Sequence, residues 1–239
     1  MADLDERTKD QRAERRRQAL RTPRAAAIAG ILFALLFTTS ISLMRFAIPE
    51  AIGGSDANAW LQNNAEPVSL ALTLVPFAGI AFLWFMGVVR AHLGDLEDQL
   101  FATVFFGSGL LFLAMIFSSA AVAGGTLSAY ALAPTVMEES GVITFGRSVI
   151  YTITNVYAIR MAGVFMLSLG TIWVRTRAMP RIFVLLTYLF AVVLLVVINL
   201  SLWVIMIFPL WVLVVSIFIL VVSLRGKQVE AESAVGADA

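Results

Sequence analysis

Six apolar runs, each about 20 residues long, constrain the fold of this chain more than any other feature. A helix of about 20 apolar residues crosses the roughly 30 Å of hydrocarbon in a lipid bilayer. The runs occupy residues 25–46, 67–89, 100–123, 149–174, 181–199 and 204–224. The sequence therefore predicts an all-α integral membrane protein with six transmembrane helices, and the lipid bilayer as its first partner.

Composition agrees with this class and excludes several kinds of chemistry. The 239 residues are 60% hydrophobic and 14% charged, whereas about a quarter of a soluble domain is charged. The chain has no cysteine, which excludes disulfides, cysteine-bound metals and thiol catalysis. Arginine far outnumbers lysine, 15 to 2, and alanine and valine are abundant, as in proteins of high-GC bacterial genomes. We therefore expect a bacterial cytoplasmic membrane protein.

The spans differ in the roles that their side chains predict. In the first span, small residues recur every four positions and let another helix approach closely. These are Ala26, Gly30, Ala34, Thr38 and Ser42. The third span is also rich in small residues, whereas the last two consist mainly of Val, Leu, Ile and Phe. This pattern predicts that spans 1–4 form a packed core and that spans 5–6 form a lipid-facing hairpin.

Charge predicts the orientation of the chain in the membrane. Residues 1–24 form a charged arm with eight basic and five acidic side chains, and residues 225–239 form a polar tail that we expect to be disordered. With six spans, this arm, residues 90–99, residues 175–181 and the tail share one side and hold fourteen of the seventeen Lys and Arg residues. The positive-inside rule then places both termini in the cytosol.

Arg160 is the one charged residue that falls well inside a predicted span. It precedes Arg175 by fifteen residues, which places it about 22 Å from the cytosolic boundary at about 1.5 Å per residue. An arginine at the bilayer centre costs about 2.5–3.5 kcal/mol on insertion scales, less near the edge, and normally faces a partner or a wet cavity. No predicted span contains an acidic residue, so the partner must come from elsewhere.

Two interpretations of Arg160 are open at this stage. In the first, Arg160, Arg147 and Arg45 surround an outward-facing cavity that binds an anionic lipid or amphipathic ligand. Tyr157 and Asn155 would complete this ligand-binding site. In the second, Arg160 snorkels towards the outer surface and pairs with Glu138 or Glu139, which makes its role structural.

The sequence contains no pattern that favours catalysis. It has no glycine-rich phosphate loop, no G-x-S-x-G motif and no paired carboxylates within the spans. His92 is the single histidine, and one histidine beside loop carboxylates is a weak metal signal. The five acidic residues of the arm argue against nucleic-acid binding. We therefore expect no enzyme activity, no cofactor and no bound metal.

Two functions from different classes remain compatible with these observations. The first is a non-catalytic accessory or scaffold protein, or a lipid-binding subunit, with a membrane-protein partner or a second copy of itself. The second is a transporter or carrier of an anionic or amphipathic solute that uses the outer-leaflet arginines. Coupled transport usually needs Asp, Glu or His inside the spans, and their absence favours the first function.

Overall fold

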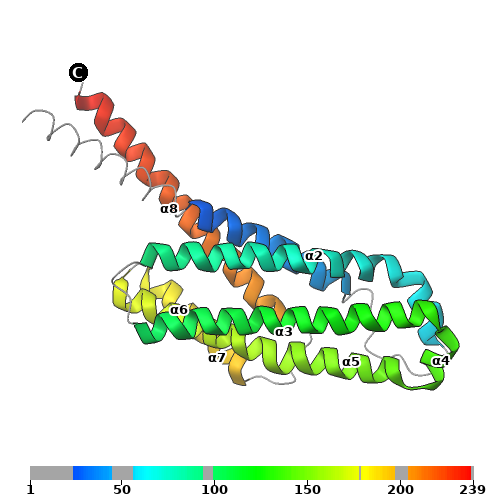
Figure 1. Cartoon of the computed structure of the whole chain (residues 1–239). Coiled ribbons are helices and arrows are strands. Elements are labelled where there is room, and N and C mark those ends of the chain that lie inside the picture. The colour runs from blue at the N-terminus through cyan, green and yellow to red at the C-terminus, as the bar shows by residue number, and fades with distance from the viewer. Residues whose placement is uncertain (1–23, 45–55, 94–98, 178, 197–203, 238–239) are drawn as a thin grey trace, which may run out of the picture.

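The computed structural model describes residues 24–44, 56–93, 99–177, 179–196 and 204–237, and the chain folds there into a bundle of long helices (Figure 1). No strand occurs in these ranges. The elements are Arg24–Met44, α2 Asp56–Leu93, α3 Gln99–Leu132, α4 Pro134–Glu139, α5 Val142–Thr152, η2 Ile153–Ala158, α6 Ile159–Thr176, α7 Arg181–Val196, η3 Val204–Met206 and α8 Ile207–Ala237.

Five helical segments are long and apolar enough to cross a membrane. They are Arg24–Met44, Glu66–Arg90, Leu100–Leu132, Val142–Thr176 and Val204–Arg225. The sixth apolar helix, α7, is shorter, with 16 residues. Each of the six falls on one of the runs predicted from the sequence, so the all-helical class is confirmed, together with five apolar helices of spanning length.

The first helix, Arg24–Met44, runs antiparallel to α8. Near its start, Arg24 Nε donates a hydrogen bond to Ser223 Oγ at 3.3 Å. Two turns later, a Cβ built on Gly30 would lie 2.0 Å from Ser216 Oγ, so the two backbones approach closely there. Ala34 is also buried. The small-residue face predicted for this segment therefore packs against other helices: α8 at Ser216, and α2, where a Cβ on Gly30 would lie 2.8 Å from Phe85.

The α5–η2–α6 segment continues as one long helix beside α3, and α7 returns along α6. The α6–α7 contact depends on two glycines. A Cβ on Gly163 would lie 3.1 Å from the Ala191 carbonyl oxygen and 2.9 Å from Leu195 Cγ, and one on Gly170 would lie 3.4 Å from Thr187. Glycine thus lets these two backbones come close. Close packing of this kind holds helices together in lipid, where the hydrophobic effect does not drive them to associate.

Aromatic rings fill the centre of the bundle. Phe82 of α2 lies at the middle of this cluster, with its ring centroid 4.7 Å from Phe33 and 5.6 Å from Phe112 and Phe208. The aromatic core comprises Phe33, Phe37, Phe82, Phe85, Phe105, Phe112, Phe165, Phe208, Trp173 and Trp211. Tilted and edge-on ring pairs at these distances are favourable beyond their burial.

The arrangement of the last two helices differs from the lipid-facing hairpin predicted for spans 5–6. Phe208 of α8 is 1% exposed, and Val212 and Val215 of the same face are buried beside it. The indole N–H of Trp211 donates to Thr187 Oγ1 of α7 at 2.9 Å. A helix that is apolar all round shows no preferred face in its sequence, so the buried stripe of α8 could not be identified there.

Several helix ends also differ from the predicted boundaries. α3 continues through Gly124–Gly125 to Leu132, because tertiary packing outweighs the helix penalty of about 1 kcal/mol per glycine. α5 and α6 together are longer than the predicted span at 149–174. α8 continues to Ala237, where a disordered tail was predicted; Lys, Gln, Glu and Ala in this stretch are good helix formers. Residues 1–23 of the predicted arm lie outside the described residues.

A polar π-helical segment beside Arg160

The segment that precedes Arg160 is a π-helix. Residues Ile153–Ala158 widen the helix between α5 and α6, with α-region backbone angles on both sides. Such π-segments are rare, and many occur at functional sites because the wider turn changes which carbonyl oxygens are paired. Here the widened turn contains the polar pair Thr154 and Asn155 in an otherwise apolar stretch.

The interior side of this segment is polar and satisfied by protein groups. Asn155 is buried, and its amide nitrogen donates to the Tyr151 carbonyl oxygen at 3.2 Å. The hydroxyls of Thr154 and Ser119 share a hydrogen bond of 2.8 Å that links the π-segment to α3. The Thr154–Ser119 bond joins two helices, whereas the Asn155 bond stays within its own helix and holds the buried amide away from the bundle surface.

Arg160 follows the π-segment by two residues and is half-buried. One of its guanidinium nitrogens donates to the Val156 carbonyl oxygen at 2.5 Å. Within the part of the chain that the structure describes, this is its only hydrogen bond, and no carboxylate forms an ion pair with it. A guanidinium has five N–H donors, so most of its donors have no partner among the described residues.

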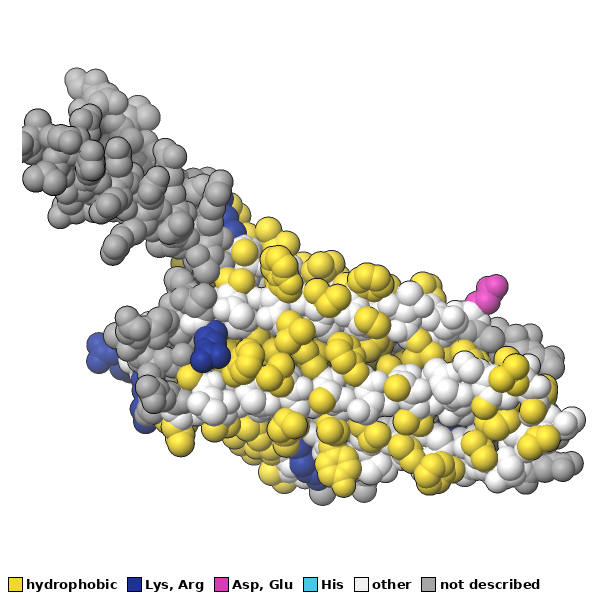
Figure 2. Space-filling view, in the orientation of Figure 1, with side chains coloured by type: hydrophobic (Ala, Val, Ile, Leu, Met, Phe, Trp, Pro, Cys, Tyr) yellow, Lys and Arg dark blue, Asp and Glu magenta, His cyan; other side chains and the backbone are white. Residues whose placement is uncertain are grey.

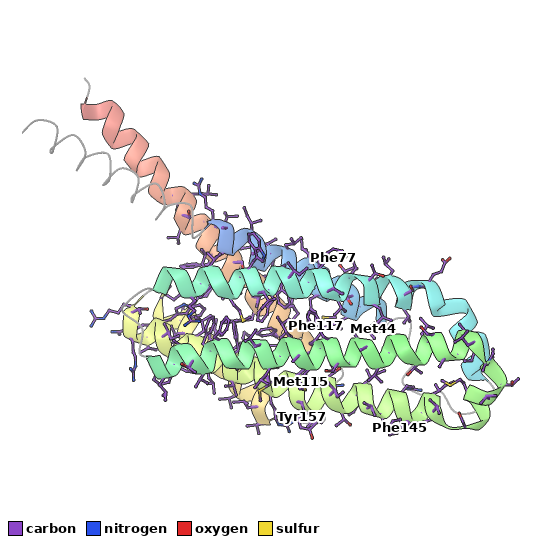
Figure 3. All side chains as sticks on the ribbon, in the orientation of Figure 1. Met44, Phe77, Met115, Phe117, Phe145 and Tyr157 are labelled. Carbon is purple, nitrogen blue, oxygen red and sulfur yellow. The ribbon has the colours of Figure 1, made fainter. Side chains whose placement is uncertain are left out.

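Tyr157 lies on the outer surface of the bundle. Its side chain is 54% exposed, and Figure 3 shows it on the outside of the α5–α6 rod. Residues three apart on a helix are neighbours on one face, so Tyr157 and Arg160 share a side of the rod. Asn155, by contrast, points inward. Of the five predicted ligand-binding residues, the structure brings together these two on one accessible face.

Arg147 does not join this face. Arg147 lies thirteen residues before Arg160 on the same continuous rod, which is an axial distance of about 20 Å. Two side chains this far apart do not bind the same compact lipid headgroup. Arg45 lies outside the described residues. Among the described residues of the predicted site, Arg160 and Tyr157 therefore share one accessible face, and the three-arginine cavity stays a prediction.

The alternative pairing of Arg160 with Glu138 or Glu139 does not fit the backbone. Both glutamates belong to α4, which ends before Gly141, the residue at which α5 begins. From Gly141 to Arg160 the rod rises about 28 Å, which exceeds the combined reach of a glutamate and an arginine side chain. The structural interpretation of Arg160 therefore needs a different partner.

The surface around Arg160 is apolar, and the basic side chains gather at one end of the bundle. Figure 2 shows Lys and Arg side chains at the end where the first helix and α8 meet, next to a broad belt of hydrophobic side chains. Two of these arginines lie over aromatic rings, Arg90 over Phe106 at 5.2 Å and Arg175 over Phe101 at 4.7 Å. The distribution matches a membrane protein with one strongly basic boundary.

The sequence contained a signal for part of this site. Thr154, Asn155 and Arg160 stand out as polar residues in an apolar run, and the structure places all three in or beside the π-segment. The π-helix itself and the Ser119–Thr154 hydrogen bond were missed, because no periodicity in a single sequence indicates where a helix gains one residue per turn.

The fold defines the class: an all-helical chain with five apolar helices of spanning length, as expected of a multi-pass protein embedded in a membrane. No protein family, no curated protein and no solved structure matches this chain. The function must therefore be inferred from the physical chemistry of the bundle.

Proposed function

We propose that the protein is a non-catalytic scaffold or accessory subunit of a bacterial cytoplasmic membrane. It crosses the membrane six times, with α7 as the fifth crossing and with both termini in the cytosol. Its partners are lipid and either another membrane protein or a second copy of itself. Large apolar side chains, among them Phe77 and Leu185, are exposed on α2 and α7, as expected for a surface that faces acyl chains.

The observation that carries this proposal is the aromatic core. A carrier needs a path along which a solute moves, lined by polar groups that replace its hydration. Here the rings of Phe82, Phe112 and Phe208 are fully buried and contact one another across three helices. Phe165 of α6 closes the fourth side, 5.3 Å from Phe82. A centre packed in this way supports a structural role over transport.

The charge distribution supports the orientation. The arginines at the end of the bundle where Arg24 contacts Ser223 are Arg24, Arg90, Arg175, Arg177, Arg181 and Arg225. Because basic residues accumulate on the cytosolic side, this end is the cytosolic one in the proposal. The first helix and α8 pack antiparallel, so the start of the first helix and the end of α8 lie on the same side of the bundle. This arrangement requires an even number of membrane crossings.

The proposal predicts that water does not reach the aromatic core. This is tested by introducing single cysteines and measuring whether a thiol reagent reaches them, since the chain has no cysteine of its own. Ser108 of α3 is 5% exposed and lies within the aromatic core, whereas Ser140 is exposed in the turn between α4 and α5. In intact cells and in inverted vesicles, a charged thiol reagent should leave Ser108→Cys unmodified. It should modify Ser140→Cys in intact cells, and both variants after denaturation in detergent.

Modification of folded Ser108→Cys from either side of the membrane would mean that water reaches the core. That result would reject the closed scaffold and favour the carrier. The reagent's reaction with the denatured variant controls for the intrinsic reactivity of the thiol.

A further inference from the structure

The helix that contains Arg160 gains one residue at its π-segment. In an α-helix each backbone N–H donates to the carbonyl oxygen four residues earlier, whereas in a π-helix it donates to the one five residues earlier. The N–H of Ile159 still follows the π pattern and donates to the Thr154 carbonyl oxygen, although α6 begins at Ile159. Where the pattern returns from five residues to four, one carbonyl oxygen is passed over and has no backbone donor. This carbonyl belongs to a residue just after Thr154.

Arg160 supplies a donor at this place. One of its guanidinium nitrogens donates to the Val156 carbonyl oxygen at 2.5 Å, and the side chain is half-buried. A carbonyl oxygen without a partner is costly away from water, and a charged donor forms one of the stronger hydrogen bonds. Arg160 therefore stabilises the π-turn through the backbone of its own helix. This role requires no carboxylate partner.

The π-turn sets which face of α5 packs on α3. At Gly146 of α5, a Cβ would lie 2.7 Å from Thr126 Oγ1 of α3, so the two helices are in close contact there. Closer to α6, the Thr154 and Ser119 hydroxyls share their hydrogen bond of 2.8 Å. Ala123 lies between Ser119 and Thr126 on the same face of α3 and is 8% exposed. These five residues form the α3–α5 seam.

Loss of the π-turn would open this seam. If the segment became α-helical, α5 would rotate by about 100° and slide by about 1.5 Å relative to α6, the amounts for one residue. Phe145 or Arg147 would then face Thr126 in place of Gly146. Both side chains are far larger than glycine, so α5 would have to move away from α3. The seam thus has two discrete arrangements, closed with the π-turn and open without it.

We propose that the π-segment is the hinge of a conformational device, in which Arg160 keeps α5 closed on α3 by holding the Val156 carbonyl oxygen. Opening exposes the seam at Ala123. The aromatic core keeps its packing, because its rings on α3 and α6, such as Phe112 and Phe165, lie beyond the hinge from α5. The inference goes beyond the proposed scaffold role. It rests on contacts within the bundle and on no membrane orientation.

Labelling of a cysteine in the seam by N-ethylmaleimide tests this device in the purified full chain. Ala123→Cys is modified when the seam opens, and its rate is proportional to the open fraction when opening and closing are fast. Adding Arg160→Met, which removes the side-chain donors, should raise this rate about tenfold, the factor for a hydrogen bond from a charged group. Arg160→Lys retains a charged donor and should raise it less. Labelling of Ser108→Cys in the aromatic core should not change with either substitution.

Deletion of Tyr157 provides an independent variant, because it removes one exposed residue from the π-segment. The helix then becomes α-helical with α5 and α6 still on their native faces. We expect the seam to stay closed in this variant, and Arg160→Met to have no further effect on the labelling of Ala123→Cys. Deletion of Val164 in α6 is the matched control. It rotates the helix by about 100° with no surplus residue to compensate, and it should raise labelling at both cysteines.

Three results would overturn the proposal. Equal labelling of Ala123→Cys with and without Arg160→Met would show that Arg160 does not hold the seam closed. An equal rise at Ala123→Cys and Ser108→Cys would make Arg160 a contributor to overall stability, with no hinge. A Tyr157 deletion as disrupted as the Val164 deletion, or one in which Arg160→Met still opens the seam, would show that the π-segment is not the hinge.

Discussion

Phe208→Ala should lower the free energy of unfolding by about 3–5 kcal/mol, the range for removing a fully buried aromatic side chain. The ring of Phe208 contacts four rings on other helices, at centroid distances of 6.0 Å to Phe33, 5.6 Å to Phe82, 4.7 Å to Phe112 and 5.7 Å to Phe165, and it also stacks on Trp211 of its own helix at 6.1 Å. Its loss leaves a cavity where four helices meet α8. The change in stability is measured by heating purified wild type and Phe208→Ala in the same detergent and monitoring unfolding by gel filtration.

Phe77→Ala is the matched control, because it makes the same chemical change on α2 at a side chain that is 57% exposed. In detergent the exposed ring contacts acyl chains both before and after unfolding, so we expect a loss below about 1 kcal/mol. If both variants lost the same stability, α8 would not be a core helix.

Gly163→Val should be the second severe substitution, with a loss of about 3 kcal/mol from overpacking. A Cβ at this position would lie 3.1 Å from the carbonyl oxygen of Ala191, which belongs to the backbone and does not move aside as a side chain does. The added methyl groups of valine would force α6 and α7 apart. Denaturation in mixed micelles, monitored by tryptophan fluorescence, gives the change in stability.

Gly87→Val controls for the intrinsic helix preference, because a Cβ on Gly87 meets no atom within 4 Å. Replacing an open helical glycine with valine is expected to be close to neutral or slightly stabilising. A Gly163→Val protein as stable as Gly87→Val would show that α6 and α7 are not in close contact.

The sequence was sufficient to predict the elements that depend on hydrophobic length. Each predicted span lies on a described apolar helix, because the length of an apolar run is set by the thickness of the bilayer and not by tertiary contacts. Of the five small residues predicted to pack in the first helix, Ala26, Gly30 and Ala34 are buried, and Thr38 and Ser42 are half-buried. A repeat of small residues is informative because only close helix packing requires it.

The sequence was not sufficient to predict which helix faces pack against one another. α8 is apolar on every side, so nothing in its residues separates the buried Phe208 and Val212 from the exposed Leu210 and Val214. The predicted arginine site is only partly described, because Arg45 lies outside the described residues. Arg147 and Arg160 belong to one continuous rod and lie about 20 Å apart along it.

The central claim is that α8 passes through the core beside the first helix, and an engineered disulfide tests it most directly. A Cβ on Gly30 lies 3.1 Å from Ser216 Cβ, close to the 3.5–4.5 Å that disulfides span, and the chain has no competing cysteine. In membranes treated with a mild oxidant, Gly30→Cys/Ser216→Cys should form an intramolecular bond, seen as a mobility shift that reducing agent reverses. Gly30→Cys/Val214→Cys, with the second cysteine on the exposed face of α8, should not. Crosslinking of neither pair, or of the Val214 pair alone, would contradict the packing of α8 and with it the closed core.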